Sequence, residues 1–174
     1  MDLAVRPMSP SKPTSTTVVK LDSGSHDFKI IGYSSSLGIG IGKYITSDIF
    51  TVGGHHWCLR YYPDGYEKDD QGEYISVFIE SVDTSCNVKA LFDIRLLDSV
   101  SGSLSVDTPE VVKPHVFGAP SDTWGFYQFI RKKDLEVSDF LRDDCFTIRC
   151  NIVVIKELSD VVDGLANTSI SQPD

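Results

Sequence analysis

The chain has 174 residues, of which 41% are hydrophobic and 24% are charged, as in folded globular proteins and unlike collagenous or wholly disordered chains. This length accommodates one domain of ordinary size together with terminal tails. The 25 acidic residues exceed the 16 basic ones, so the formal net charge is −9. Because phosphate backbones bind clustered Lys and Arg, this acidic balance argues against nucleic acid as a partner.

The N-terminal segment is made mostly of Ser, Thr, Pro and Lys, with almost no large apolar side chains. It cannot bury enough apolar surface to offset the entropy of ordering, so residues 1–25 are expected to form a disordered arm. Its prolines and serines interrupt the apolar run that a secretory signal requires. No stretch reaches the roughly 20 apolar residues that span a bilayer, so we expect no membrane contact and an intracellular location, in the nucleus, the cytoplasm or both.

Six segments after residue 25 are rich in Val, Ile, Phe and Tyr and are bounded by turn residues, which is typical of β-strands. They are "HDFKIIGY" from His26, "DIFTV" from Asp48, "HWCLRYYP" from His56, "EYISVFIESVD" from Glu73, "VKALFDIRLLD" from Val88 and "CFTIRCNIVVIKEL" from Cys145. Strands this short and numerous predict an all-β sandwich or barrel. In the segment from Glu73, Ile75, Val77 and Ile79 share the face expected to be core, whereas Tyr74 and Phe78 share the other.

A glycine-rich stretch, "GIGIGKY" (38–44), has the composition of a nucleotide-binding loop, but its spacing fits none of the known motifs. Only three residues separate Gly38 from Gly42, and Tyr44 follows Lys43 where a P-loop needs Ser or Thr. The dinucleotide fingerprint also fails, because Gly42 comes one position too early and no helical periodicity follows. We interpret the stretch as a mobile loop between strands.

Histidines and cysteines form no catalytic or metal-binding arrangement in the sequence. His55 and His56 are adjacent, and adjacent residues of a strand face opposite ways, while the four cysteines form no CxxC pair. Cys58 and Cys150 lie in strand-like runs and are expected to be buried thiols. No Ser-His-Asp or Cys-His pairing can be assembled, so the sequence predicts no enzyme activity, no cofactor and no metal.

Residues 121–136 combine small polar residues, two aromatics around a glycine, and a basic amphipathic run. The run "YQFIRKKDLE" predicts one short helix near 127–134. Trp124 and Phe126 flank Gly125, which lets another backbone approach closely, although an aromatic side chain taken singly is more often a core residue. Exposed aromatics beside a sheet edge suit a peptide-binding groove, because the edge supplies main-chain hydrogen bonds and the rings supply pockets.

The content and order of these segments resemble the MATH domain, the TRAF-like module of plant MATH-BTB proteins. The resemblance rests on "FKIIGYSSSLGIGIGKYITSDIFTVGGHHWCLRYYPDG", "YISVFIES", "VKALFDIRLLD" and "DTWGFYQFIRKKDLEVSDFLRDDCFTIRC", and it spans residues 26–158. It implies an antiparallel β-sandwich of about eight strands, followed at 159–174 by a flexible tail or a linker to a BTB domain. In that family the MATH domain recruits substrates to a cullin-3 ubiquitin ligase, and the BTB domain dimerises and contacts the cullin.

The resemblance also implies a peptide groove similar to that of the MATH domain of speckle-type POZ protein, which holds an extended Ser/Thr-rich segment among aromatic side chains. Eight positions match that groove or its rim: Tyr74, Phe78, Phe92, His115, Asp122, Trp124, Gly125 and Phe126. His115 matches a tyrosine only with one residue inserted, and Phe78 lacks the hydroxyl of the tyrosine it replaces. Asp122-Thr123 stands where the animal groove has Lys-Asp, and Tyr127 replaces a lysine, so a less basic rim should tolerate different peptide charges.

The expected function is that of a substrate-recognition module, which binds short Ser/Thr-rich segments of transcription factors or other regulators for a cullin-3 ligase adaptor. Contact with cullin-3 would run only through a BTB domain, which is absent from these 174 residues. Two alternatives stay open: a lone MATH domain that competes with ligase adaptors, and a self-association scaffold like TRAF trimers. Residues 1–25 lack the heptads of a coiled coil that would support a trimer.

Overall fold

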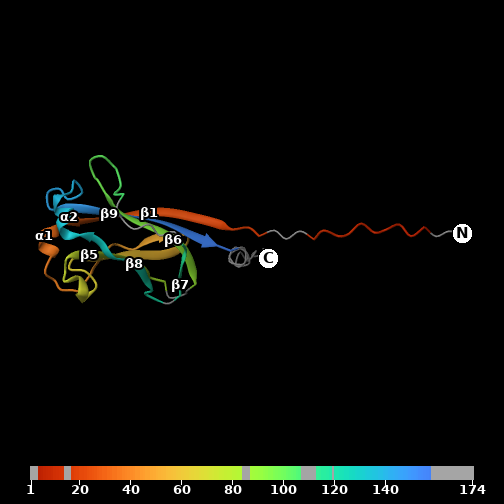
Figure 1. Ribbon diagram of the computed structural model, residues 1–174, viewed down its shortest axis with the longest axis horizontal. Helices are drawn as coiled ribbons and strands as arrows, with labels where there is room; N and C mark the ends of the chain where they lie inside the picture. Colours follow the sequence, from red (N-terminus) through yellow and green to blue (C-terminus); the bar gives the residue numbers. More distant parts are fainter. Residues whose placement is uncertain (1–3, 14–16, 84–86, 107–112, 119, 158–174) are drawn as a thin grey trace, which may run out of the picture.

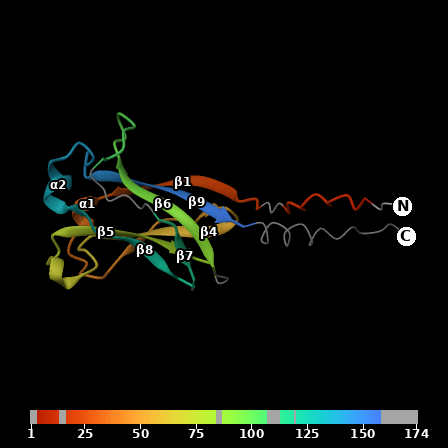
Figure 2. The ribbon, with the colours of Figure 1, turned by 45° about the vertical axis from the view of Figure 1, so that its right-hand side comes forward.

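Two antiparallel β-sheets packed face to face make up most of the computed structural model (Figures 1 and 2). The structure describes residues 4–13, 17–83, 87–106, 113–118 and 120–157. The first sheet has the strand order β1 (Lys20–Ile31), β9 (Cys145–Lys156), β6 (Val88–Leu97) and β7 (His115–Phe117). The second has the order β2 (Ile45–Thr46), β4 (His55–Tyr62), β5 (Tyr74–Ser81) and β8 (Thr123–Arg131), with β3 (Phe50–Val52) also paired to β4. The predicted all-β sandwich is confirmed.

Helices are few and short. The structure has α1 (Tyr33–Ser36), α2 (Lys132–Val137) and a single 3₁₀ turn at Lys68–Asp70. Both α1 and α2 lie at one end of the sandwich, opposite the end where β1 begins and β9 finishes (Figures 1 and 2). In the described part of the chain, no helix has the length and apolarity needed to cross a bilayer.

The core lies between the sheets and is built by the alternation of strand side chains. Ile75, Val77 and Ile79 of β5 are fully buried, as predicted from their spacing. They pack in one cluster with the inward residues of the facing sheet, such as Ile94 of β6 and Ile148 of β9. The buried, unpaired thiols predicted for Cys58 and Cys150 are also observed.

The first strand begins earlier than expected, because residues 20–25 belong to β1 and not to an N-terminal arm. Lys20 pairs with Lys156 and Ser25 with Asn151, so this polar stretch completes the long β1–β9 ladder. Its Ser, Gly and Asp residues carry little strand propensity, and the backbone hydrogen bonds to β9 decide its conformation. The described residues 4–13 and 17–19 contain no helix or strand, and the expected tail at 159–174 lies outside the described residues.

The predicted helix near 127–134 is wrong for its first half. Residues 127–131 are the end of β8, and the helix α2 covers Lys132–Val137. Ile130 pairs with Ile75 and Arg131 with Tyr74, and the Lys132 amide donates to the Glu73 carbonyl at 2.9 Å. Pairing with β5 therefore overrides the amphipathic pattern of the sequence, and the strand that carries Trp124 was missing from the predicted set.

Candidate functional site

The strand β8 forms one edge of its sheet. It pairs with β5 on one side, and no strand in the described part of the chain pairs with its other side. The short strand β7 is likewise an edge of the facing sheet, and both strands run along the same side of the sandwich (Figures 1 and 2). An edge strand presents free N–H and C=O groups, to which another extended chain can add.

The register of β8 decides where its aromatic side chains lie. Trp124 is opposite Ile79, and Phe126 is opposite Val77, so both lie on the face turned toward the other sheet. Gly125 is opposite Phe78 on the outer face. A Cβ atom at Gly125 would lie 2.6 Å from the Phe78 Cα and still closer to the Val77 carbonyl oxygen. Only glycine allows the two backbones to approach this closely.

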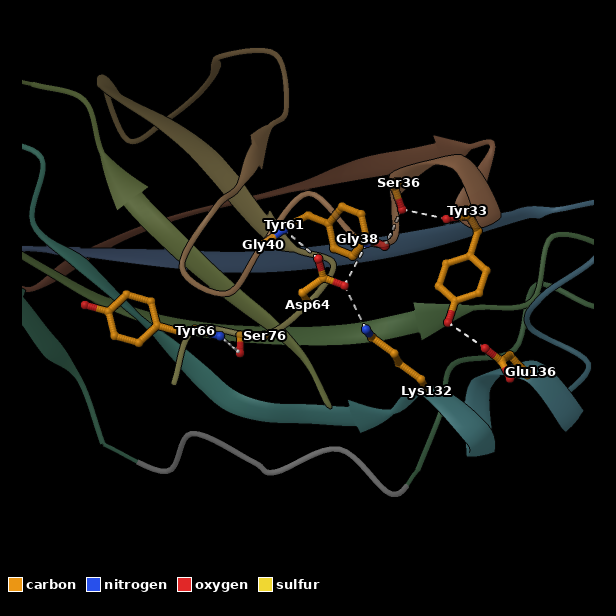
Figure 3. A network of polar contacts seen from close by, with 10 residues as sticks. All are labelled: Tyr33, Ser36, Gly38, Gly40, Tyr61, Asp64, Tyr66, Ser76, Lys132 and Glu136. Atoms are coloured by element: carbon orange, nitrogen blue, oxygen red, sulfur yellow. Dashed lines mark hydrogen bonds and ion pairs between the residues drawn. The ribbon is translucent and has the colours of Figure 1, made fainter. Parts of the chain in front are cut away.

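A bulge follows directly in β8. Residues 127–129 lie opposite the single residue Ser76, since Phe126 pairs with Val77 and Ile130 with Ile75. The Ser76 hydroxyl donates to the Tyr127 carbonyl. It also accepts from the Tyr66 amide at 2.9 Å (Figure 3). The bulge redirects the strand, and this hydroxyl joins it to the loop that carries Tyr66.

Three aromatic rings gather on the outer face at this bulge. The ring centroid of Phe78 lies 5.1 Å from that of Tyr127 and 5.4 Å from that of Tyr66, and the two tyrosine rings are 5.3 Å apart. Phe78 is 5% exposed, whereas Tyr66 and Tyr127 are 46% and 44% exposed. They border a hollow of about 210 Å³ whose lining residues are Tyr66, Phe78, Thr123, Trp124, Gly125 and Tyr127. We call it the aromatic hollow.

A second group joins the edges of the two sheets beside the aromatic hollow. The rings of Trp124 and His115 stack at 4.4 Å with an interplanar angle of 15°. The Asp122 carboxylate accepts from the Gly118 amide at 3.1 Å and lies 3.5 Å from His115 Nε2. That nitrogen is buried and has no hydrogen-bond partner among the described residues.

The eight residues expected in the groove therefore separate into four places. Phe78, Trp124 and Gly125 line the aromatic hollow, and His115 and Asp122 lie next to it. Phe92 is buried in the core, and Phe126 packs against it with ring centroids 6.4 Å apart. Tyr74 lies at the opposite end of β5.

Tyr74 lies outside the aromatic hollow and near the start of α2. Its hydroxyl accepts a hydrogen bond from the Arg131 guanidinium at 2.8 Å. It lines a separate hollow of about 410 Å³, together with Phe129, Arg131 and Phe140 among others. That hollow is larger, but the aromatic hollow is the one bordered by the exposed rings of Tyr66, Trp124 and Tyr127.

Sequence reasoning missed Tyr66 and misplaced Tyr127. Tyr127 lay in the predicted helix, where its side chain would not share a face with Phe78. If 123–131 is a strand, alternation places Gly125 and Tyr127 on one face. Tyr66 follows a Pro-Asp-Gly turn (63–65), and no pattern in the sequence brings this loop over Phe78.

Asp64 fixes the turn that carries Tyr66. Its carboxylate accepts from the Gly38 amide at 3.0 Å, the Gly40 amide at 2.7 Å and the Lys132 ammonium at 2.9 Å (Figure 3). Burial raises the pKa of the Asp64 carboxyl, but these hydrogen bonds outweigh burial, so the pKa lies below its ordinary value. The glycine-rich stretch is thus tied down at two amides, whereas we expected a mobile loop.

The adjacent histidines contact a single carboxylate, which sequence alternation did not suggest. His55 Nδ1 lies 3.0 Å from Asp83 Oδ2, and His56 Nδ1 lies 2.8 Å from Asp83 Oδ1. Asp83 follows β5 and reaches both rings because they stand at the start of β4. Within the described ranges, no group of three or more His, Cys, Asp or Glu side chains is arranged to hold a metal ion.

Comparison with known proteins identifies the family to which this fold belongs. Residues 25–152 match the MATH domain family. BTB/POZ and MATH domain-containing protein 4 of Arabidopsis thaliana is 44% identical over 156 residues, which are 86% of this chain and 34% of that protein. BTB/POZ and MATH domain-containing protein 3 of the same plant is 40% identical over 147 residues, or 82% of this chain and 36% of that protein.

A more distant relative comes from an animal. TD and POZ domain-containing protein 2 of Mus musculus is 23% identical over 150 residues, which are 80% of this chain and 39% of that protein. The chain thus spans a little more than a third of the length of these relatives. The family match over residues 25–152 and the plant relatives show that the chain belongs to the MATH domain family, which is non-catalytic.

Proposed function

We propose that this MATH domain binds short, extended peptide segments of other proteins along the free edge of β8. One observation carries the proposal: the unpaired edge runs directly beside the aromatic hollow. The edge supplies main-chain hydrogen bonds, and the hollow supplies a pocket for one side chain. Tyr66 and Tyr127 are both about half exposed, so a ligand can reach both rings from solvent.

Strand alternation then predicts which side chains the peptide presents. A residue added beside Gly125 points to the outer face, where its apolar side chain packs against the exposed rings of Tyr66 and Tyr127 at the aromatic hollow. The neighbouring residue of the peptide points the other way, toward Trp124 and His115. A Ser or Thr hydroxyl suits that position, because it can hydrogen-bond His115 Nε2 and donate to the Asp122 carboxylate.

We propose further that the domain recognises substrates for a cullin-3 ubiquitin ligase adaptor. The plant relatives carry a BTB/POZ domain by name, and such a domain would make the contact with the cullin. A BTB domain that dimerises would also raise the avidity of a weak peptide site. The parent protein would act inside the cell, in the nucleus, the cytoplasm or both, on transcription factors or other regulators.

The first test is a titration with an array of Ser/Thr-rich peptides, followed by tryptophan fluorescence. Trp57 is fully buried and Trp124 is half exposed, so a ligand-induced change reports on Trp124. Saturable binding that the Trp124→Ala variant loses, with an unchanged thermal unfolding temperature, supports the proposal. Tyr44→Ala is the control, since Tyr44 has a similar exposure, directly precedes β2 of the same sheet and does not line the aromatic hollow. If no peptide changes the tryptophan fluorescence of the wild-type domain, the proposal is overturned.

Self-association is the second candidate, because the free edge of β8 can pair with β8 of another copy. Such a dimer would bury Trp124 and Tyr127 and would block the peptide site. Light scattering across a wide range of protein concentration tests it. A monomer at every concentration removes this candidate.

A further inference from the structure

An acidic loop contacts the edge strand β8 at its bulge, beyond Trp124 and Gly125 along the strand. Residues 67–73, which join β4 to β5, contain four carboxylates and one lysine, in the sequence "EKDDQGE". Within this loop, Asp70 Oδ1 accepts a hydrogen bond from Gln128 Nε2 at 2.7 Å. Gln128 is one of the three bulged residues of β8. The loop is therefore fixed to the strand to which the ligand is proposed to add.

The second carboxylate oxygen of Asp70 has no hydrogen-bond partner in the part of the chain that the structure describes. Asp70 Oδ2 is buried and makes no hydrogen bond with any described residue, and the same holds for one other side-chain atom, His115 Nε2. Both atoms belong to residues that contact β8, Asp70 at Gln128 and His115 at Trp124. Buried polar atoms without partners are rare and costly, so a hydrogen-bond donor from a ligand bound at β8 would stabilise Asp70 Oδ2.

The chemistry of a carboxylate restricts what can complete Asp70. An ionised carboxylate only accepts hydrogen bonds, and its strongest partners are Lys and Arg. Two cations at the junction of β8 and α2 are engaged elsewhere, because Arg131 donates to Tyr74 and Lys132 binds Asp64. Tyr127 precedes Gln128 and Tyr66 precedes the acidic loop, and both rings are about half exposed, so a cation held over the exposed face of either ring gains from it.

We propose that Asp70 is a specificity-determining residue, which selects a Lys or Arg side chain in the peptide bound along β8. This inference rests on the proposed peptide-binding function. Gln128 follows Trp124 on β8, and the bulge at 127–129 interrupts one-to-one pairing, so the basic residue lies roughly three to five positions from the Ser or Thr beside Trp124. The ligand class is thus an extended peptide with a hydroxyl residue, an apolar residue next to it and a basic residue beyond the apolar one.

The test uses the tightest peptide from the array and replaces, one position at a time, the residues three to five places from its Ser or Thr. Each position is synthesised with Lys, Arg, norleucine or citrulline, so that charge changes while size is kept. Dissociation constants are measured by fluorescence anisotropy with the wild-type domain, Asp70→Asn and Asp69→Asn. Asp69→Asn is the matched control, since it removes the same charge from the same 3₁₀ turn at an exposed residue.

At one position, the wild-type domain is expected to bind the Lys and Arg peptides roughly tenfold more tightly than their neutral counterparts. Asp70→Asn should reduce this ratio to about twofold, while Asp69→Asn leaves most of it. Equal binding of charged and neutral peptides would mean that Asp70 Oδ2 is satisfied by water, and it would overturn the inference alone. Equal loss in both variants would assign the effect to the general charge of the loop, again against the inference. Failure of every peptide to bind would overturn the proposed function and this inference together.

Discussion

The two tryptophans of this domain lie on the same face of the same sheet, yet they differ completely in exposure. Trp57 of β4 is 0% exposed and Trp124 of β8 is 48% exposed. Trp57 sits in a central strand, donates its indole N–H to the Val52 carbonyl at 3.2 Å and packs edge-on against Phe117 at 5.0 Å. Trp124 sits in the edge strand, where its partner is His115 of the short edge strand β7. The position of a strand in its sheet, more than the residue type, decides whether a tryptophan is buried in the core or half exposed.

The largest expected effect on stability comes from replacing Trp57, the buried tryptophan of the two. Trp57→Ala should lower the free energy of unfolding by roughly 3–5 kcal/mol, since it removes a large side chain from a packed core. Trp124→Ala should lower it by less than about 1 kcal/mol and abolish peptide binding instead. Urea unfolding followed by circular dichroism measures both variants. A loss for Trp124→Ala as large as that for Trp57→Ala would make Trp124 a core residue.

The glycine between the two aromatics of β8 gives the next largest effect. Gly125→Ala places a Cβ 2.6 Å from the Phe78 Cα, so β5 and β8 must separate, at a cost of roughly 1–3 kcal/mol. The floor of the aromatic hollow would move with them, and binding should weaken together with stability. Gly118→Ala is the matched control, since a Cβ there meets no atom closer than 4.0 Å. Equal unfolding curves for Gly125→Ala and the wild type would contradict the close approach of the strands.

A smaller effect on stability is expected from Asp64, which fixes the turn that carries Tyr66. Asp64→Asn replaces a charged acceptor of three hydrogen bonds and should cost about 1–2 kcal/mol at pH 7. The folded-state pKa of Asp64 lies below its ordinary value, so its contribution is full above the unfolded pKa and is lost as the pH falls through the folded pKa. The difference between wild type and Asp64→Asn should therefore be large at pH 7 and shrink below about pH 4.

Chemical unfolding at a series of pH values measures this difference, and Asp139→Asn serves as the control because Asp139 is exposed. Peptide binding by Asp64→Asn should weaken about threefold, since the turn loses the anchor that orients Tyr66. A difference between the two proteins that stays constant from pH 7 to pH 3 would rule out the ionised carboxylate as the source of the stability.

The sequence was sufficient for the sandwich, for the inward face of β5 and for the family, because alternation and turn residues are local signals. It failed where a long-range contact decides the structure. Residues 127–131 have a helix-like pattern, and pairing with β5 makes them a strand. Residues 20–25 look like a polar arm, and the long β9 makes them a strand as well.

The candidate site depended on such contacts even more than the fold did. Trp124 and Gly125 were recognised by resemblance, whereas Tyr66 lies over Phe78 only because Asp64 and Ser76 fix its loop. The orphan oxygen of Asp70 is visible only when Gln128 is placed on the bulge. Hydrogen bonds between residues this far apart produce no periodic pattern in the sequence from which they could be predicted.

The smallest expected effect on stability comes from His115, and its sign is informative. His115→Phe keeps the stacking on Trp124 and the edge contact with Phe117. It removes a buried nitrogen for which the described residues provide no hydrogen-bond partner. The variant should be unchanged or more stable by up to about 1 kcal/mol, while its preference for Ser or Thr over Ala in the peptide should fall about fivefold. His26→Phe is the control, since His26 also stacks on an aromatic ring, that of Phe50 at 4.4 Å, away from β8. A gain in stability without a loss of selectivity would remove His115 from the proposed peptide site, while Trp124 would stay in it. The stacking of His115 on Trp124 would then serve only to hold the indole in place.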